Sequence, residues 1–390
     1  MRRSGLLVVA ALLPLTACGS DGDGDPPPVI SPSPTPSPAT TPTPMPTATP
    51  TPTPTTTAVT RTPVATFSNP WAMAFLPDGR LLVTERGGAL RVVTTAGAVS
   101  VPVAGVPAVA AAGQGGLLDV ALDPAFASNN RIYLSYAESS GGSTGLAVAR
   151  GTLSANGQQL TGVQVIWRQA PKIVSSETRH YGGRLAFSPA GQLFITAGER
   201  HQGAPAQDLS GTLGKIVRIN PDGSLPADNP FANGIWSLGH RNPYGLVFAT
   251  DGRLFESEMG PEGGDEFNLV TRAANYGWRT VSEGNDGEVL PRHATRPDFA
   301  APLVTWTPVI APGGMIQYTG TRFLGWQGDF ILAGLVQQGI VRVRVSGATA
   351  AEAARISLSA RIREVEQGPD GTIWVLEDGA AGRLVRLDPA

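Results

Sequence analysis

The sequence is poor in several residue types that would indicate particular classes of protein. Its 390 residues include one cysteine, Cys18, so no disulfide can form within the chain. Only 15% of the residues are charged and the formal net charge is −2, and this lack of a basic excess argues against nucleic acid as a partner. Long helical periodicities are also scarce, whereas glycine and short alternating apolar runs are abundant. The composition therefore favours a β-rich protein.

The N-terminus has the pattern of a secretory signal. Arg2 and Arg3 precede an apolar run at residues 5–15, and Leu-Thr-Ala-Cys follows at residues 15–18. The apolar run is too short to span a membrane. Its ending resembles a bacterial lipobox, which implies removal of residues 1–17 and lipidation of Cys18. The alternative is an ordinary cleaved signal followed by a chance cysteine.

Residues 18–63 are rich in proline and threonine. Residues 26–54 hold 13 of the 35 prolines and almost no bulky apolar side chains, so burial cannot offset the entropy of ordering them. In extended polyproline geometry these 29 residues reach roughly 90 Å. We expect a disordered tether that holds a domain at residues 64–390 away from a lipid anchor. The protein would then be exported and held at the bacterial cell envelope, on its periplasmic or outer-membrane face.

A turn followed by a strand recurs along residues 64–390. LPDGRLLVTER, SPAGQLFITAGE, ATDGRLFESE and GPDGTIWVLED are similar, and looser copies are SNNRIYLSYAE and WQGDFILAGL. Asp-Gly supplies the positive backbone angles that a tight hairpin requires. Six units of about 55 residues predict an all-β, six-bladed β-propeller, in which loops from several blades meet at the central channel. Because the spacing is irregular, a β-sandwich or two β-domains remain alternatives.

Three stretches place polar side chains directly before apolar strands. His180 stands before Gly182-Gly183 in TRHYGGRLAF, and Gln114 occupies the matching position in GQGGLLDVAL. We expect the two glycines to leave room for a planar ligand. Arg241 and Asn242, in LGHRNPYGL, can donate hydrogen bonds to an oxyanion or a quinone-like oxygen. The alternative for this third stretch is a structural corner with a buried histidine.

The stretch SEMGPEGGDEFNLV carries four acids around Gly260-Pro261. Hard cations such as Ca²⁺ bind carboxylate and backbone carbonyl oxygens in flexible loops, so a metal loop is one interpretation. A solvated acidic turn is the other.

Arg361 and Arg363 lie two residues apart, so in a strand both point to the same face. Two adjacent guanidiniums repel unless an anion meets them, which suggests an anionic ligand. Alternatively, both are exposed and pair with Glu364 or Glu366.

Together these stretches resemble the soluble quinoprotein sugar dehydrogenases, the glucose/sorbosone dehydrogenase family. The resemblance covers residues 69–388 and includes GQGGLLDVALDP, HYGGRLAF, LGKIVRINPDGSLPADNPF, LGHRNPYGL, SEMGPEGGDEFNL, NYGW and RIREVEQGPDG. It implies a six-bladed propeller that binds pyrroloquinoline quinone (PQQ) and Ca²⁺. The implied reaction is oxidation of an aldose to a lactone, with electrons passed to an external acceptor.

The resemblance also implies roles for individual residues. His180 matches the general base, and Arg241, with Asn242 beside it, matches the arginine next to the reacting quinone carbonyl. Gln114, Arg361 and Arg363 match further PQQ contacts, Gly260 and Pro261 match carbonyl ligands of the Ca²⁺ that touches PQQ, and Glu266 and Tyr276 match ligands of a second, structural Ca²⁺.

The sequence departs from the glucose-oxidising branch at two positions. Gln337 is nearest to the position of a cofactor-binding lysine, and Arg179 replaces an acidic residue before the histidine. Both differences favour the broader aldose dehydrogenase branch. Trp306 is either a platform for a sugar ring or a core residue. Two other functions remain as alternatives: a non-catalytic propeller that binds a glycan or protein, and a Ca²⁺-dependent lactonase.

Overall fold

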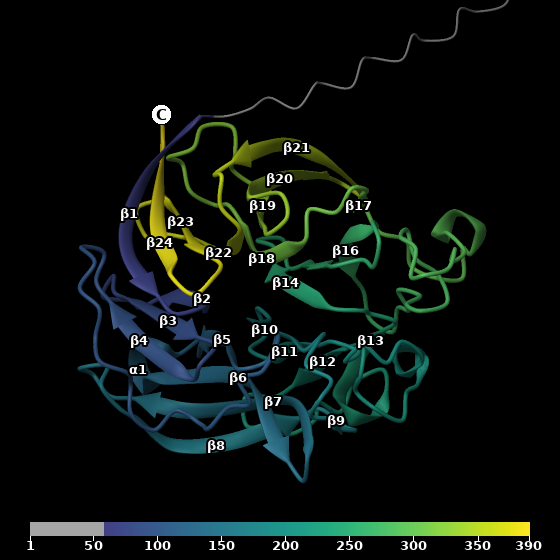
Figure 1. Cartoon of the computed structure of the whole chain (residues 1–390), viewed down its shortest axis with the longest axis horizontal. Coiled ribbons are helices and arrows are strands. Elements are labelled where there is room, and N and C mark those ends of the chain that lie inside the picture. The colour runs from purple at the N-terminus through teal and green to yellow at the C-terminus, as the bar shows by residue number, and fades with distance from the viewer. Residues whose placement is uncertain (1–57) are drawn as a thin grey trace, which may run out of the picture. The chain divides into compact units, whose positions relative to one another are not determined.

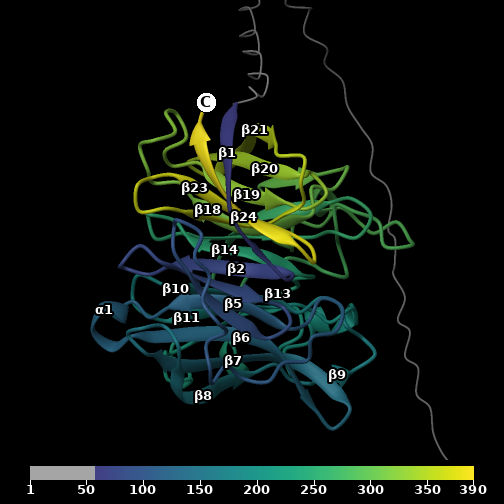
Figure 2. The same cartoon turned by 60° about the vertical axis from the view of Figure 1, so that its left-hand side comes forward.

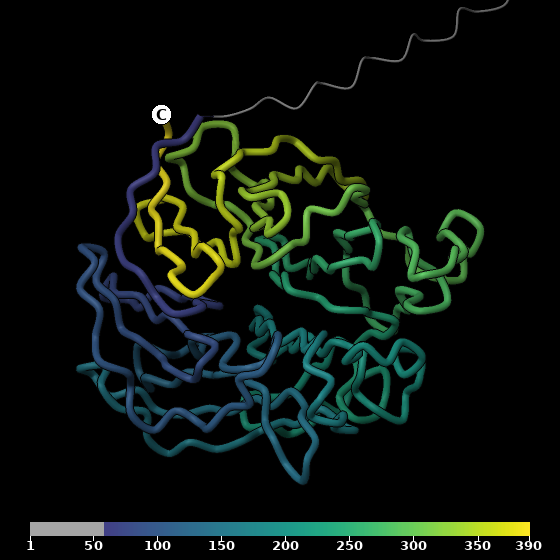
Figure 3. The backbone as a smooth tube through the Cα atoms, in the orientation of Figure 1, coloured from purple at the N-terminus to yellow at the C-terminus, as the bar shows by residue number. Residues whose placement is uncertain are grey.

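A computed structural model describes residues 58–390, and the predicted signal peptide, Cys18 and most of the predicted tether lie outside the described residues. The described chain consists almost entirely of strands, which form six sheets arranged in a ring (Figures 1 and 3). The all-β, six-bladed propeller is confirmed, and the sandwich alternative is wrong. Among residues 58–390, no helix is long and apolar enough to cross a membrane.

Each sheet is a blade whose strands run in order from the centre outward. The first sheet contains β2 (Pro70–Phe75), β3 (Leu81–Glu85) and β4 (Ala89–Val93). The second contains β5 (Leu117–Leu122), β6 (Arg131–Ser140), β7 (Ser143–Leu153) and β8 (Leu160–Arg168), and β9 (Ile173–Val174) pairs with β7. The third contains β10 (Gly182–Phe187), β11 (Leu193–Ala197), β12 (Lys215–Ile219) and β13 (Ile235–Leu238). The next two are β14 (Pro243–Phe248), β15 (Leu254–Glu258), β16 (Asp265–Val270) and β17 (Val304–Trp306); and β18 (Pro312–Gln317), β19 (Phe330–Gly334), β20 (Gly339–Ser346) and β21 (Thr349–Ser357). The sixth is β22 (Ile362–Gln367), β23 (Ile373–Glu377) and β24 (Gly382–Pro389), completed by β1 (Val59–Phe67).

The helices are single turns in the connections. They are α1 (Phe126–Asn129), η1 (Ala204–Gln207), η2 (Ala232–Gly234) and η3 (His293–Thr295). The innermost strands β2, β5, β10, β14, β18 and β22 contact one another in cyclic order. They lie around the centre of the ring in Figure 1, and Figure 2 shows the same ring turned by 60°. This inner ring surrounds the central channel.

The two ends of the described chain close the ring. Strand β1 pairs antiparallel with β24, from Val59 opposite Pro389 to Phe67 opposite Gly382. The predicted domain boundary at residue 64 was therefore too late, since residues 59–63 already belong to β1. The run from Val59 is rich in β-branched residues, and Pro63 is tolerated because it lies in an edge strand, beside a shift in register.

The recurring turns occupy equivalent places, each between the first and second strand of a sheet. Their marker residues are Gly79, Asn130, Gly191, Gly252, Gly328 and Gly371, and all have positive φ. The aspartates that precede three of these glycines do not have positive φ. The expectation that Asp-Gly supplies two positive backbone angles was therefore wrong for the aspartate. Instead, Asp78 Oδ1 accepts the N–H of Arg80 at 3.0 Å, which stabilises the turn from its side chain.

Apolar side chains fill the space between neighbouring sheets. Phe255 and Phe267 stack, Phe330 packs against both at a steep angle, and Trp306 joins the same cluster with 3% of its surface exposed. The indole Nε1 of Trp306 donates to Glu352 at 2.7 Å. Trp306 is therefore a core residue and not a sugar platform.

Candidate active site

The predicted site residues gather at one end of the central channel because they precede or begin inner strands. Gln114 precedes β5, His180 precedes β10, Arg241 precedes β14 and Arg361 precedes β22. A cavity of about 180 Å³ lies among them and is lined by Trp71, Arg86, Gln114, Tyr244, Met259, Ala311, Leu335, Val336, Arg361 and Arg363. We call this the arginine-lined cavity. Gln114, Arg361 and Arg363, which are far apart in the sequence, thus share one pocket, while His180 and Arg241 do not line it.

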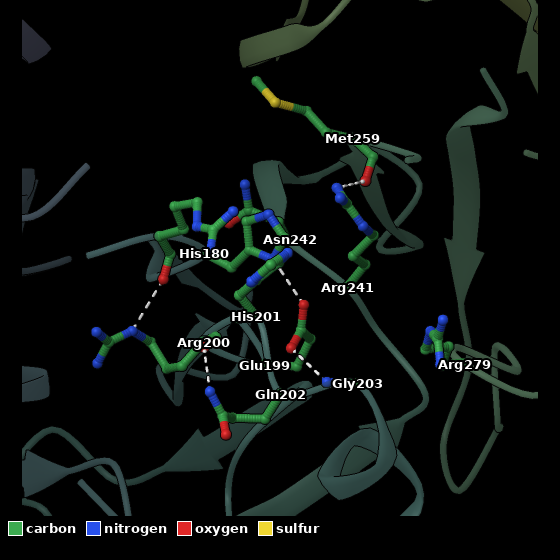
Figure 4. Close-up of polar contacts among 12 residues, drawn as sticks. His180, Glu199, Arg200, His201, Gln202, Gly203, Arg241, Asn242, Met259 and Arg279 are labelled. Atoms are coloured by element: carbon green, nitrogen blue, oxygen red, sulfur yellow. Dashed lines mark hydrogen bonds and ion pairs between the residues drawn. The ribbon is translucent and has the colours of Figure 1, made fainter. Parts of the chain in front are cut away.

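His180 is held in a fixed orientation by two hydrogen bonds. Its backbone N–H donates to Gln114 Oε1 at 2.7 Å. Its Nδ1 lies 2.6 Å from Oε1 of Glu199, and Figure 4 shows the two residues side by side. Its Nε2 has no hydrogen-bond partner within residues 58–390. Burial lowers the pKa of His180, the hydrogen bond to Glu199 opposes this, and the charge of Arg241 lowers the pKa further. The lowered pKa favours the neutral imidazole, and the free Nε2 is the atom that can accept a proton.

The glycines after His180 serve packing and not an approach path for a ligand. Gly182 has φ of +65°, and a Cβ there would lie 2.8 Å from the backbone nitrogen of Gly198, directly after the neighbouring strand β11. A Cβ on Gly183 would lie 2.8 Å from Leu118. The expected room for a planar ligand is therefore filled by protein. The glycines let β10 approach its neighbours closely, which fixes the strand that follows His180.

Arg241 and Asn242 bring unpaired hydrogen-bond donors to the site. Arg241 Nη1 donates to the carbonyls of Met259 and Gly260, both at 3.0 Å, while its buried Nε has no acceptor among the described residues. Asn242 Oδ1 accepts the N–H of Gly182, and its buried Nδ2 is likewise unpaired there. Unpaired buried donors are costly, so these two nitrogens fit a ligand oxygen.

His240, in contrast, is a core residue. It is fully buried, its Nε2 lies 2.9 Å from Ser237 Oγ, and its ring stacks on Tyr276 with the centroids 4.6 Å apart. The alternative of a buried structural histidine is therefore confirmed for His240.

Three guanidiniums make the arginine-lined cavity cationic. Arg361 and Arg363 do share a face, and both pair with Asp378, at 3.1 and 2.9 Å. The expected alternative partners do not serve them, since Glu364 pairs with the buried Arg184. One carboxylate therefore balances two arginines, and Arg86 adds a third positive charge to the lining. A cavity of this charge fits an anionic ligand.

The two positions that depart from the glucose-oxidising branch point away from this cavity. Gln337 Oε1 accepts from Arg355 Nη1 at 3.3 Å, and Leu335 and Val336 take its place in the lining. Arg179 is half exposed and binds Glu177 through two nitrogens, at 2.9 and 2.8 Å.

The acidic loop is mostly buried, so the solvated-turn alternative was wrong. Only Glu262 of its four acids is exposed, while Glu258, Asp265 and Glu266 are buried. Burial and the neighbouring charge of Glu258 raise the pKa of Glu266. Glu256, on the adjacent strand, has its pKa raised by the same causes. Carboxylates crowded in this way fit a cation.

A cavity of about 10 Å³, the size of one water or ion, is lined by Glu258, Gly260, Glu266 and Tyr276 among others. The sequence analysis assigned Gly260 to one calcium site and Glu266 and Tyr276 to another, but all three line this one cavity. Pro261 does not line it. The hydroxyl of Tyr276 is already hydrogen-bonded to the backbone of residues 269 and 271. Tyr276 could therefore bind a cation only through its carbonyl.

Two neighbours of His180 were not identified from the sequence. Glu199 follows β11, and its Oε2 also accepts the N–H of Gly203 at 2.8 Å. His201 packs edge-on against His180, with the ring centroids 5.2 Å apart. The sequence signal for Glu199 was its position just after β11. That strand pairs with β10, which follows His180.

Comparisons with known proteins agree with this site. The family model Glucose / Sorbosone dehydrogenase matches residues 67–386. Aldose sugar dehydrogenase of Escherichia coli is 39% identical over 336 residues, covering 82% of this chain and 90% of the relative. Quinoprotein glucose dehydrogenase B of Acinetobacter calcoaceticus is 27% identical over 413 residues, covering 83% and 86%.

Among solved structures, the PQQ-bound form of aldose sugar dehydrogenase from Streptomyces coelicolor has a TM-score of 0.72 and 30% identity, covering 86% of this chain and 99% of that one. A match across nearly the whole described domain, in both sequence and fold, identifies the class of enzyme. The chain belongs to the glucose/sorbosone dehydrogenase family and is an oxidoreductase of the sugar dehydrogenase type.

Proposed function

We propose that the protein oxidises aldose sugars at C1 to lactones, depends on PQQ and Ca²⁺, and passes the electrons to an external acceptor. The observation that carries the proposal is the fixed His180, whose Nε2 is free, whose Nδ1 is bound by Glu199 and whose N–H binds Gln114 of the arginine-lined cavity. PQQ is suggested by the quinoprotein relative and by the PQQ-bound relative.

The residues of this chain fit PQQ. Arg86, Arg361 and Arg363 supply positive charge for its carboxylates, and Gln114 lines the same cavity. The unpaired donors of Arg241 and Asn242 suit the reacting carbonyl oxygen of the quinone. When bound, PQQ supplies a quinone that accepts a hydride from the sugar. Ca²⁺ would be held in the small cavity by Gly260, Glu266 and the carbonyl of Tyr276, and it would add positive charge to the site.

His180 does the proton chemistry. Its Nε2 takes the proton of the anomeric hydroxyl as the C1 hydride leaves, so the cyclic sugar loses two electrons and becomes a lactone. Glu199 stabilises the imidazolium that forms, because its carboxylate accepts from Nδ1 at 2.6 Å. General-base assistance of this kind contributes typically about 10²- to 10⁴-fold.

Export and anchoring belong to the same proposal. The lipobox-like sequence before Cys18 and the proline-rich segment after it support a lipid-anchored enzyme at the cell envelope. A tether of this reach would let the active site meet soluble sugars and an acceptor at a distance from the membrane.

Reconstitution tests the function. Protein prepared without cofactor should gain a visible absorbance band on addition of PQQ and Ca²⁺, and should then reduce a dye acceptor when aldoses are added. A folded protein that binds PQQ but oxidises no sugar would contradict the catalytic proposal. Protein that gains no band would favour a non-catalytic propeller or, if it hydrolyses lactones with Ca²⁺, the lactonase.

A further inference from the structure

A buried arginine beside His180 has no part in the chemistry described above. Arg200 follows Glu199 in the loop after β11, and it is 0% exposed. Its guanidinium donates four hydrogen bonds, and every acceptor is an uncharged oxygen of the backbone or of a threonine. Burying a cation is costly, so the groups that surround Arg200 show what its charge holds in place.

The guanidinium of Arg200 holds the segment that leads into His180. Its Nη2 donates to the carbonyl of Glu177 at 2.6 Å. Its Nε donates to the carbonyl of Arg179 at 3.0 Å (Figure 4). Residues 175–179 belong to no strand, so their position depends on such bonds. The planar fork of a guanidinium can serve two carbonyls of one segment at once, whereas the single ammonium of a lysine lacks this geometry.

The same guanidinium ties this segment to the neighbouring blade. Its Nη1 donates to the carbonyl of Thr144, in β7, at 2.8 Å, and its Nη2 donates to the hydroxyl of Thr144 at 3.2 Å. Its central carbon lies 3.6 Å from the ring centroid of Tyr181, whose hydroxyl donates to the same threonine at 2.9 Å. Arg200 thus holds both residues that flank His180, Arg179 by a hydrogen bond and Tyr181 by stacking.

The backbone of His180 needs this support because its conformation is unusual. His180 has φ of +51°, in the left-handed region that residues other than glycine rarely adopt. Arg200 has φ of +57°, and its N–H donates to the carbonyl of His180 at 3.1 Å. Backbone strain of this kind persists only where the surrounding structure fixes it. Arg200 supplies much of that surrounding structure through its backbone and its side chain.

We propose that Arg200 is a positioning residue, which holds His180 in this conformation and thereby keeps its Nδ1 on Glu199 and its Nε2 free for the substrate. The inference rests on the proposed function, since it takes His180 as the base. Arg200 itself is fully buried and lines neither the arginine-lined cavity nor the small cavity beside Glu266. Its loss should therefore leave the space for ligands unchanged but let the ring of His180 adopt orientations in which Nε2 is misaligned.

The first measurement is turnover. Arg200→Met removes the guanidinium and keeps an unbranched side chain over Tyr181. Its kcat at saturating PQQ and Ca²⁺ should fall roughly 10- to 100-fold, because small misplacements of a catalytic group are costly, whereas KM should change less. Arg200→Lys keeps the charge but not the fork, so it should recover only part of the loss.

Arg218→Met is the matched control. Arg218 is also buried and lies in the same blade, in β12. Its guanidinium carbon lies 4.7 Å from the ring centroid of Trp236, and its Nε donates to Asn229 at 2.7 Å. Because none of these contacts involves the segment before His180, this variant should lose stability but keep the kcat of the parent.

The second measurement needs no cofactor. The chain has only four histidines, so their ring N–H signals can be assigned in NMR spectra. The Nδ1 proton of His180, in a bond of 2.6 Å to Glu199, should give a sharp low-field signal in the parent. This signal should broaden or disappear in Arg200→Met, while the signals of the buried His240 and His293 stay in place.

A lower kcat together with a disturbed His180 signal, and neither change in Arg218→Met, supports the inference. An unchanged kcat or an unchanged His180 signal in a folded Arg200→Met protein overturns it. If Arg200→Met does not fold, Thr144→Val decides, because it removes the hydroxyl that Arg200 and Tyr181 share. Smaller changes in the same direction would then support the inference, and a parent-like signal and kcat would overturn it. A parent that oxidises no sugar contradicts the proposed function, and the NMR signal then decides whether Arg200 fixes His180.

Discussion

Replacing Glu199 with glutamine would separate the two tasks of its carboxylate. The two oxygens accept from His180 Nδ1 at 2.6 Å and from the N–H of Gly203 at 2.8 Å, and the residue is 1% exposed. A glutamine has only one acceptor oxygen. If that oxygen binds Gly203, the amide N–H₂ faces Nδ1, and the proton moves to Nε2, where it blocks the base. If the oxygen binds His180 instead, the N–H₂ group faces the N–H of Gly203 and loosens the loop.

In both orientations a hydrogen bond to a charged group is lost, worth about 1.5–3 kcal/mol. We therefore expect kcat/KM to fall by about 10- to 150-fold in Glu199→Gln, with PQQ affinity unchanged. The pH profile supplies a second measurement. Because burial lowers the pKa of His180, the parent should lose activity as the pH falls through a value below 6.5. Because Glu199 raises that pKa, the variant should lose activity only at still lower pH, which shifts the acid limb of its pH profile.

A nearby carboxylate provides the control for Glu199→Gln. Glu177 pairs with Arg179 and lies 3.3 Å from His201 Nδ1, but it makes no bond to the His180 ring. Glu177→Gln should therefore leave the acid limb of the parent in place. Full activity and an unshifted acid limb in Glu199→Gln would refute the reasoning that this carboxylate orients and charges the base.

Four further outcomes are expected. His180→Gln should bind PQQ normally and lose turnover by roughly 10²- to 10⁴-fold in dye assays, and near-normal turnover would refute its role as the base. Arg363→Ala should weaken PQQ binding in absorbance titrations more than Arg383→Ala, whose guanidinium pairs with Glu377 at 2.5 Å, and equal affinities would argue against the anionic cavity. Chelation should lower the melting temperature of the parent, because an ion bound only by the native state stabilises that state. The melting temperature of Glu266→Ala should already be low and should not respond to Ca²⁺. A parent melting temperature that does not change with chelator excludes structural calcium. Cys18→Ser should move the protein from the membrane to the soluble fraction without changing its specific activity, and retention in the membrane would contradict the lipid anchor.

The sequence was most informative where one conformation repeats. The six turns were recognisable because glycine, or asparagine at position 130, supplies a positive φ at the same place in every blade. Once six blades are expected, residues that precede inner strands must meet at one mouth of the channel. This geometry brought Gln114, His180 and Arg241 together, as the sequence predicted.

Pairings across the blades could not be predicted in the same way. Asp378, rather than Glu364 or Glu366, serves Arg361 and Arg363, because strand β22 turns those glutamates toward the channel. Trp306 had the same apolar neighbours in sequence whether it faced a sugar or the core. Choosing the partner of a charged side chain requires knowledge of which strand lies opposite it, and that follows only from the folded ring.

The closure of the ring by β1 and β24 has a consequence for how the protein acquires its structure. The first described strand finds its partner only in the last one, so β1 remains an unpaired edge until residues 382–389 are free to pair. A contact that joins the ends of the domain is formed late and slowly, because a very long loop must close. Throughout that interval the β-branched residues from Val59 onward are open to pairing with another chain, until the last blade is completed.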